Sequence, residues 1–254
     1  MVVQMARSEN ESSDRPRTAV IIPVFNEEES LPLVLDEIPS DLIDEVIVVD
    51  NGSTDNSAAL AVAHGATVVQ EPARGYGAAC LCGIAASVEH EVLVFLDGDY
   101  SDYPEDMREL LPPVVEREAD MVIGSRMLRA GSRSALLPQA RYGNQLAAFL
   151  MRWLFGIRCS DLGPFRVIRR KALLDLEMTD RDFGWTVEMQ LRARLRDLTV
   201  VEIPVRYRKR VGESKITGTL RGTLLASYKI LKTIFTYWVS PPRFRADSPA
   251  NPLR

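Results

Sequence analysis

The feature that most constrains the fold is an alternation, over residues 18–123, between short apolar runs and helical stretches such as 28–38 and 77–89. Continuous apolar strands that alternate with helices are typical of a parallel sheet covered by helices on both faces. We therefore predict an α/β fold whose first strands lie at residues 18–23, 45–50, 66–70, 92–96 and 121–123.

The second half of the chain, residues 124–204, has mixed patterns, and we interpret it as a continuation of the same domain. Helices are expected at residues 141–155 and 185–196, and strands at 165–168 and 200–203. With 254 residues, of which 46% are hydrophobic, the chain suits one large domain. We expect a single domain with a mostly parallel central sheet flanked by helices, followed by a C-terminal amphipathic helix.

Polar segments follow the first four strands at the point where each ends. They read PVFNEEE, DNGSTD, EPARGYG and DGDYSD, at residues 23–29, 50–55, 71–77 and 97–102. Because ligands of parallel sheets bind beyond the carboxyl ends of the strands, all four segments should line one crevice. Each segment alone also suits an ordinary turn or helix N-cap. The pair Gly75-x-Gly77 lacks the third glycine of a dinucleotide-binding loop.

Charge and composition exclude several functional classes. A net charge of −4 and a pI of about 5.4 give no indication of nucleic-acid binding. Three cysteines without a second C-x-C pair suit reduced thiols in a cytosolic protein, and two histidines argue against a histidine metal site or a catalytic triad. From Arg206 to Arg245, however, ten Lys or Arg residues face one acidic residue, which indicates a local anionic partner, either phosphate or membrane.

Both ends of the sequence are predicted to be disordered. Residues 1–17 are polar and of mixed charge, which predicts a disordered leader and no secretory signal, and residues 241–254 are expected to form a disordered tail. Lys229 and Lys232 interrupt the longest apolar stretch, so no membrane-spanning helix is expected. We expect a cytoplasmic protein, at most peripheral on the inner face of the cytoplasmic membrane.

Five motifs in a fixed order carry a resemblance to a known family. IIPVFNEEESLPLVL, VVDNGSTDNSA, FLDGDYSDYPEDM, GSRM and GESK, in this order, resemble the inverting family-2 glycosyltransferases with a GT-A fold. The resemblance covers roughly residues 18–238. The branch they resemble most is that of the polyprenyl-phosphate (dolichyl-phosphate) mannose and glucose synthases. The resemblance implies a GT-A domain over residues 18–215, with a nucleotide-binding half at 18–123 and an acceptor half at 124–215. It also implies a nucleotide-sugar donor, GDP-mannose or UDP-glucose, and a polyprenyl-phosphate acceptor.

The acidic segment after the fourth strand matches the metal site of that family. By resemblance, Asp97 and Asp99 are a D-x-D pair around Gly98 that holds Mg²⁺ or Mn²⁺ together with the donor diphosphate. Carboxylates crowd in this way when a cation and phosphates belong between them, because these ions prefer oxygen ligands. A third ligand is expected nearby, either Ser101 or Asp102, of which we favour Asp102.

The resemblance also implies residues that bind the nucleotide sugar. Pro23, Phe25 and Glu27 match positions that hold the base and ribose, and Asp50 matches a carboxylate that contacts the base. Arg74 suits a phosphate or ribose contact. These residues alternatively form a strand end with a packed aromatic ring and a helix-start acid.

Basic residues of the second half match phosphate contacts of the family. Arg126 of the GSRM motif is expected at the donor or acceptor phosphates, and Lys215 lies in the GESK loop expected to close over the diphosphate. Arg208 and Arg210 flank that loop, and whether Lys209 or Arg210 closes on the phosphates stays open. A solvated basic face is the alternative reading of these cations.

The acceptor decides whether a catalytic base is needed. A polyprenyl phosphate is already anionic, whereas a hydroxyl acceptor requires a general base. Glu188 in GWTVEMQLRARL is the first candidate for that base and Asp161 the second, and either could instead be structural. The alternative function is therefore a soluble transferase that uses a hydroxyl acceptor, with Glu188 as base. A non-catalytic nucleotide-sugar binding protein is a third possibility, which the intact Asp97 and Asp99 pair disfavours.

The C-terminal helix, expected at residues 216–240, has one apolar stripe, while Arg221, Lys229 and Lys232 lie off it. The stripe could pack on the protein itself or lie in a membrane interface. The oligomeric state and the acceptor chain length stay open. The stripe consists of Leu220, Leu224, Tyr228, Leu231, Phe235 and Trp238.

Overall fold

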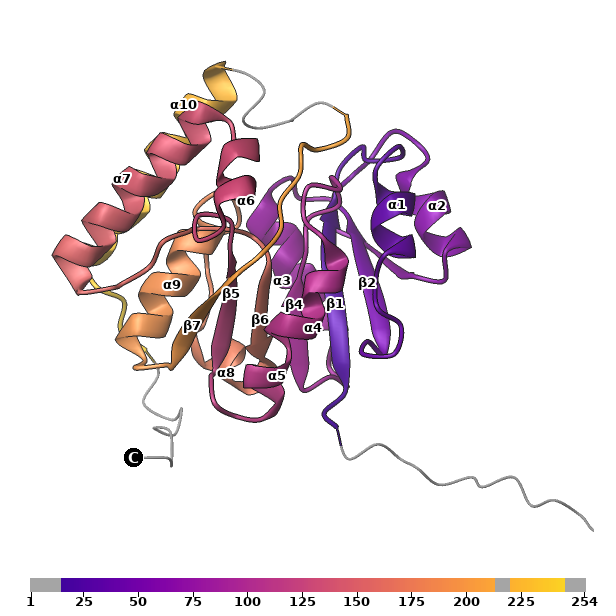
Figure 1. Cartoon of the computed structure of the whole chain (residues 1–254), viewed down its shortest axis with the longest axis horizontal. Helices are drawn as coiled ribbons and strands as arrows, with labels where there is room; N and C mark the ends of the chain where they lie inside the picture. Colours follow the sequence, from indigo (N-terminus) through magenta and orange to yellow (C-terminus); the bar gives the residue numbers. More distant parts are fainter. Residues whose placement is uncertain (1–14, 213–219, 245–254) are drawn as a thin grey trace, which may run out of the picture.

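A seven-stranded sheet, counted within the described residues, runs through the molecule in the order β3-β2-β1-β4-β6-β5-β7 (Figure 1). The computed structural model describes residues 15–212 and 220–244. Strand β6 pairs antiparallel with β4 and β5, and the other neighbours are parallel. The strands are β1 (Thr18–Val24), β2 (Glu45–Asp50), β3 (Thr67–Gln70), β4 (Val92–Phe95), β5 (Met121–Ser125), β6 (Arg166–Arg169) and β7 (Val200–Pro204).

The prediction of a mostly parallel sheet flanked by helices is confirmed. Each expected strand lies within two residues of an observed one. The reason is burial on both faces: every residue of β4 and β5 is buried, so these strands read as continuous apolar or small-residue runs.

Two helical layers cover the sheet. One face packs against α1 (Leu31–Asp36), α2 (Ser57–Ala63), α4 (Met107–Leu110) and α5 (Pro112–Val115), the last two following a short 3₁₀ turn at Pro104–Asp106. The other face packs against α3 (Tyr76–Ala86), α8 (Arg170–Asp175) and α9 (Trp185–Leu195). Alternate residues of β1 serve the two cores, with Ile22 in the first and Ile21 in the second.

A third layer lies outside α9. Helices α7 (Pro138–Phe155) and α10 (Leu220–Val239) lie side by side at one flank of the molecule, and α6 (Ala130–Ala135) precedes α7 (Figure 1). Their shared core contains Ala147, Met151, Leu191 and Ile234. Within the described residues, no helix combines the length and apolar character that a membrane crossing requires.

The register of the sheet places the site. Val24 at the end of β1 is level with Asp50 at the end of β2, and Asp50 is level with Gln70 at the end of β3. The loops that follow these strands therefore begin at one edge of the sheet, as predicted. Residues 1–14, 213–219 and 245–254 lie outside the described residues, and with them most of the predicted leader and tail and Lys215.

Candidate active site

A cavity of about 490 Å³ opens at the carboxyl ends of β1, β2 and β4. The structure brings together around it eight residues that the sequence had singled out, namely Pro23, Phe25, Glu27, Arg74, Asp97, Gly98, Asp99 and Arg210. The rest of the lining is Val24, Asn51, Gly75, Tyr76, Ala79, Asp182 and Phe183.

The acidic segment, residues 97–102, contains carboxyl groups that are buried close to one another, which makes their ionisation unfavourable. Burial and the neighbouring charge of Asp99 raise the pKa of Asp97 to about 7. Burial, followed by the charge of Asp97, raises the pKa of Asp102 well above its ordinary value. Both carboxylate oxygens of Asp102 are buried with no hydrogen-bond partner. Asp102 lies behind the cavity and does not line it. A cluster of this kind is poorly compensated by the protein alone.

Arg210 forms an ion pair with the acidic segment. Its Nη1 lies 3.1 Å from Asp99 Oδ2, and its Nη2 donates to Glu27 Oε1 at 2.9 Å. The backbone N–H of Val211 also donates to the carbonyl of Asp99 at 3.0 Å, which holds this segment against the loop after β4. Lys209, the other residue considered for this role, is exposed and does not line the cavity.

Ser30 joins two of the motif loops, a contact that the sequence did not reveal. It is 1% exposed, and its hydroxyl is within 2.8 Å of the carbonyl oxygen of Gly98 and 2.9 Å of Glu27 Oε2. A single hydroxyl hydrogen satisfies one of these acceptors at a time. Ser30 thus ties the loop after β1 to the D-G-D loop after β4.

Part of the cavity lining is aromatic and cationic. The guanidinium of Arg74 lies 3.6 Å from the centroid of the Phe25 ring. Asp50 is buried and does not line the cavity, and its Oδ1 accepts the backbone N–H of Ser53 at 2.8 Å. Asp50 therefore shapes the turn after β2 in this structure.

Asn51 positions the loop that carries Arg74. Its side-chain amide donates to the carbonyls of Glu71 and Ala73, and its Oδ1 accepts the N–H of Gly75. Sequence reasoning treated this asparagine as part of a turn motif. Its place directly after a strand-end aspartate was the only signal available.

Tyr76 is a second residue that sequence reasoning missed. Its hydroxyl donates to Asp97 Oδ1 at 3.1 Å from the first position of α3. Gly75 and Gly77 on either side allow residues 180–181 to approach. A Cβ on Gly75 would lie 2.1 Å from the carbonyl oxygen of Arg181, and one on Gly77 would lie 2.1 Å from that of Asp180.

Residues 179–184, called here the α9 loop, carry Asp182 and Phe183 to the cavity. Glu188, on α9, holds this loop from behind. Its carboxylate accepts the N–H groups of Thr179 and Asp180, the Thr179 hydroxyl and Arg192 Nε. Burial acts to raise the pKa of Glu188, but these hydrogen bonds outweigh it and lower the pKa below its ordinary value. Glu188 does not line the cavity.

Arg126 and Asp161 form a buried pair beside the acidic segment. Nε and Nη2 of Arg126 donate to the two Asp161 oxygens at 2.8 and 2.7 Å, and the backbone N–H of Arg126 adds a third bond. The guanidinium also lies 5.1 Å from the Tyr207 ring centroid. Neither member of the pair lines the cavity.

Arg208 lies away from the cavity. It pairs with Glu37 through Nη2 at 2.7 Å and lies over the rings of Tyr100 and Tyr103, 3.3 and 4.1 Å from their centroids. Sequence reasoning expected this arginine at the phosphates, whereas here it fastens the segment after β7 to the end of α1.

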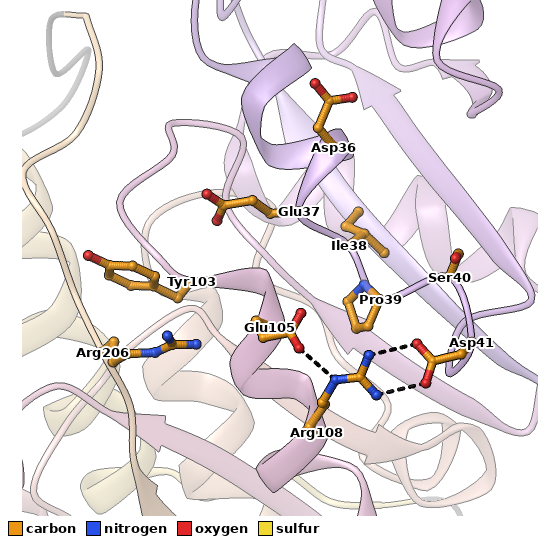
Figure 2. A pocket seen from close by; sticks show the side chains of 10 residues that line it. All are labelled: Asp36, Glu37, Ile38, Pro39, Ser40, Asp41, Tyr103, Glu105, Arg108 and Arg206. Atoms are coloured by element: carbon orange, nitrogen blue, oxygen red, sulfur yellow. Dashed lines mark hydrogen bonds and ion pairs between the residues drawn. The ribbon is translucent and has the colours of Figure 1, made fainter.

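A second cavity, of about 450 Å³, has Glu37 in its lining (Figure 2). Figure 2 shows Arg108 between Asp41 and Glu105, with bonds to both. Arg206 at its other side pairs with Asp106 at 2.6 Å. Its cations are thus already neutralised by the protein, so we assign it no ligand.

The donor set of the first cavity fits a divalent cation that arrives with phosphates. Within residues 15–212 and 220–244, no three His, Cys, Asp or Glu side chains converge closely enough to hold a metal alone. Mg²⁺ is usually bound by one or two carboxylates plus substrate phosphates. Asp97 and Asp99 supply two such carboxylates at the cavity, where burial and the charge of Asp99 raise the pKa of Asp97.

Comparison with curated proteins gives relatives over most of the chain. An uncharacterised glycosyltransferase of Mycobacterium tuberculosis is 40% identical over 216 residues, which cover 85% of this chain and 96% of the relative. Polyprenol monophosphomannose synthase of Mycolicibacterium smegmatis is 31% identical, covering 85% and 88%. Undecaprenyl-phosphate mannosyltransferase of Micrococcus luteus is 31% identical, covering 81% and 90%.

Solved structures give the same fold. Glucosyl-3-phosphoglycerate synthase of Mycobacterium tuberculosis, in complex with phosphoglyceric acid, aligns with a TM-score of 0.70 and 25% identity over 90% of this chain and 81% of that chain. The same enzyme with Mn²⁺, UDP-glucose and phosphoglyceric acid aligns with a TM-score of 0.69 and 26% identity over 89% and 81%. The sequence pattern of Glycosyl transferase family 2 matches residues 19–176. The chain belongs to this family and is a glycosyltransferase with a GT-A fold.

Proposed function

We propose that the protein transfers a hexose, with inversion, from a nucleoside-diphosphate sugar to a polyprenyl phosphate. The observation that carries the proposal is that Asp97 and Asp99 line the same cavity as Phe25 and Arg74, whose guanidinium lies against the Phe25 ring. That arrangement offers carboxylates for a cation with its diphosphate, and a flat aromatic and cationic surface for a base. Relatives named as transferases to polyprenol and undecaprenyl phosphate support the acceptor class.

The donor end of the reaction uses residues of the first half. In the proposal Phe25 and Arg74 bind the base, and Pro23, Glu27 and the segment at Asp50 shape the pocket around base and ribose. Gly98 lets the loop after β4 pack against the end of β1, where a Cβ would lie 3.2 Å from Val24 Cγ2. Asp97 and Asp99 would hold Mg²⁺ or Mn²⁺, whereas Asp102, the third ligand favoured from the sequence, is buried and does not line the cavity. When bound, the cation neutralises the charge that develops on the departing diphosphate.

Arginines supply the remaining positive charge. Arg210 reaches into the cavity and is proposed to exchange its contacts with Asp99 and Glu27 for donor phosphate oxygens. Arg126, held by Asp161, provides a fixed positive charge behind the acidic segment. Lys215 and Arg208 keep their proposed phosphate roles, although Lys215 lies outside the described residues and Arg208 is paired with Glu37.

A phosphate acceptor suits the state of the two carboxylates that the sequence offered as bases. One of its anionic oxygens would attack the anomeric carbon as the bond from that carbon to the diphosphate breaks, and no proton needs to be removed. Positioning and charge neutralisation then supply the catalysis. Glu188 and Asp161, the two carboxylates considered as bases, are both engaged in buried ion pairs.

A second candidate, transfer to a hydroxyl, is favoured by one observation. Asp182 lines the cavity and is placed to act as a general base there. The structural neighbour crystallised with phosphoglyceric acid is named as a glucosyl-3-phosphoglycerate synthase, so the fold also serves that class of acceptor. In this alternative Asp182 replaces Glu188 as the base.

The deciding experiment is a transfer assay with GDP-mannose and UDP-glucose, each offered polyprenyl phosphate or a soluble alcohol, with Mn²⁺ and with EDTA. We expect product on the lipid phosphate with one donor, loss of product in EDTA, and loss of most turnover in Asp99→Ala. Full activity in EDTA would refute the role of the cation, and exclusive glycosylation of the alcohol would refute the acceptor. Because the proposed acceptor is a membrane lipid, the proposal includes peripheral contact with the inner face of the cytoplasmic membrane.

A further inference from the structure

The outer face of the α7 and α10 pair exposes large apolar side chains at helical spacing. On α7 the exposed residues are Tyr142, Leu146, Phe149 and Trp153, the last two with 63% and 71% of their surface accessible. Steps of four, three and four residues place them on one side of the helix. Single exposed apolar residues are common, but a full-length stripe of them marks an interaction surface.

Helix α10 continues this surface. Its buried side is formed by Ile230, Ile234 and Tyr237, which pack in the core shared with α7 and α9. The opposite side exposes Leu225, Tyr228, Phe235 and Trp238. Of the predicted stripe, Tyr228, Phe235 and Trp238 are exposed and Leu231 is half-buried, while a different set of residues packs inward.

The charges around this surface have one sign. From Met121 to Ser160 the chain has six arginines and no acidic residue, and α10 has no acidic residue either. Arg152 on α7 and Lys232 on α10 are exposed. Lys229, by contrast, is occupied by Asp180, 3.1 Å away. The chain as a whole is acidic, with a net charge of −4, so the absence of acidic residues from these two helices is a local feature.

We propose that the outer face of α7 and α10 docks on the headgroup layer of an anionic membrane. Tyr and Trp side chains prefer that layer, because it accommodates an apolar ring and a polar tip together. Arg152 and Lys232 would contact anionic headgroups. The inference rests on the proposed function for its purpose, because a lipid-linked acceptor has to be met at a membrane surface.

A second copy of the chain fits this face less well. A two-fold dimer would place the same surface against itself. Arg152 and Lys232 would then approach their own copies, and neither helix has an acidic residue to receive them. An anionic lipid surface supplies the missing negative charge.

Vesicle co-sedimentation of the full chain tests the proposal, without sugar nucleotide or polyprenyl phosphate. We expect the wild type to sediment with phosphatidylcholine vesicles that contain phosphatidylglycerol, and less with pure phosphatidylcholine. Phe149→Glu with Trp153→Glu should weaken binding by at least ~10-fold. The matched control is Val62→Glu with Val88→Glu, at positions of equal exposure (62% each) outside this face, and it should bind as the wild type does.

A second variant separates charge from apolar insertion. Arg152→Glu with Lys232→Glu should lose most binding to the anionic vesicles while binding to neutral ones stays unchanged. Circular dichroism checks folding, and Phe235→Glu with Trp238→Glu repeats the test on α10 if the α7 variant unfolds.

Two outcomes would overturn the inference: a wild type that stays in the supernatant with anionic vesicles, or folded variants with glutamate on the outer face of α7 and α10 that sediment as the wild type does. A wild-type dimer that Phe149→Glu with Trp153→Glu converts to a monomer would assign the face to a second copy and also overturn it. A wild type that binds the anionic vesicles but does not glycosylate polyprenyl phosphate would count against the proposed function and would leave the membrane-docking inference intact.

Discussion

The hydroxyl of Tyr237 on α10 donates a hydrogen bond to Glu188 on α9 at 2.7 Å. Glu188 in turn holds the α9 loop, which carries Asp182 and Phe183 to the cavity. The outermost helix of the molecule is thus linked to the active site through one buried carboxylate. This link makes Glu188 a positioning residue in our interpretation, and its role can be measured through stability.

Glu188→Ala should destabilise the fold strongly. Arg192 would remain buried without its carboxylate, and removal of one partner of a buried pair costs about 3–5 kcal/mol. Tyr237→Phe removes one hydrogen bond and should cost about 0.5–1.5 kcal/mol. Urea unfolding measures both, with Tyr142→Phe as the control because that tyrosine is exposed. A Glu188→Ala protein as stable as the wild type would contradict this interpretation.

The same carboxylate has a defined pH dependence. The pKa of Glu188 is lowered from an ordinary value of 4.5, so its contribution is complete above that pH. The contribution is lost as the pH falls further, through the lowered pKa. The stability difference between the wild type and Glu188→Gln should therefore shrink in acid.

Asp97→Asn should stabilise the metal-free protein at neutral and alkaline pH. The pKa of Asp97 is raised from 3.8 to about 7, so the ionised carboxylate destabilises the fold, and this penalty grows between those two pH values. Thermal unfolding in EDTA should show a larger gain from the substitution at pH 8 than at pH 5. Equal gains at both pH values would mean that the charge of Asp97 is compensated in the folded protein.

Much of this site could be predicted because parallel strands end together. Phe25, Asp97 and Asp99 lie directly after apolar runs, so their convergence follows from the sheet. The partners of Arg208 and Glu188 could not be predicted in this way. Arg208 pairs with Glu37, 171 residues earlier, and Glu188 meets Tyr237, 49 residues later. Such pairs depend on tertiary packing, which leaves no periodic signal in the sequence.

Arg210→Ala should weaken donor binding by at least ~10-fold, because one charge-assisted contact to phosphate contributes about 1.5–3 kcal/mol. Lys209→Ala is the matched control, since the neighbouring Lys209 is exposed and outside the cavity. Calorimetric titration of GDP and UDP with Mn²⁺ provides the affinities. Equal affinities in the two variants would leave Arg210 as an internal partner of Glu27 and Asp99.

Gly77→Ala should disturb the cavity although it adds one methyl group. The new Cβ would lie 2.1 Å from the backbone carbonyl oxygen of Asp180, so the α9 loop must shift. We expect a loss of stability of about 1–3 kcal/mol, with weaker donor binding. Gly143→Ala is the control, because nothing lies within 4 Å of the added carbon, and in the middle of α7 it should stabilise the fold by about 0.5–1 kcal/mol. Unfolding and nucleotide titration of both variants check the pair.

Substitutions of Asp182 and Glu188, measured together, identify the class of acceptor. If the nucleophile is a polyprenyl phosphate, Asp182→Asn and Glu188→Gln should both keep turnover within about tenfold of the wild type, because the attacking oxygen is already ionised. If the nucleophile is a hydroxyl and Asp182 is its base, Asp182→Asn should lose about 10²- to 10⁴-fold in kcat. Glu188→Gln distinguishes positioning from chemistry, because a positioning role lowers stability and donor affinity before it lowers kcat. The measurement is kcat at saturating donor, followed over pH. A collapse of lipid-phosphate transfer in Asp182→Asn, with a pH profile that loses its acidic limb, would overturn the reaction without a base and favour the hydroxyl mechanism.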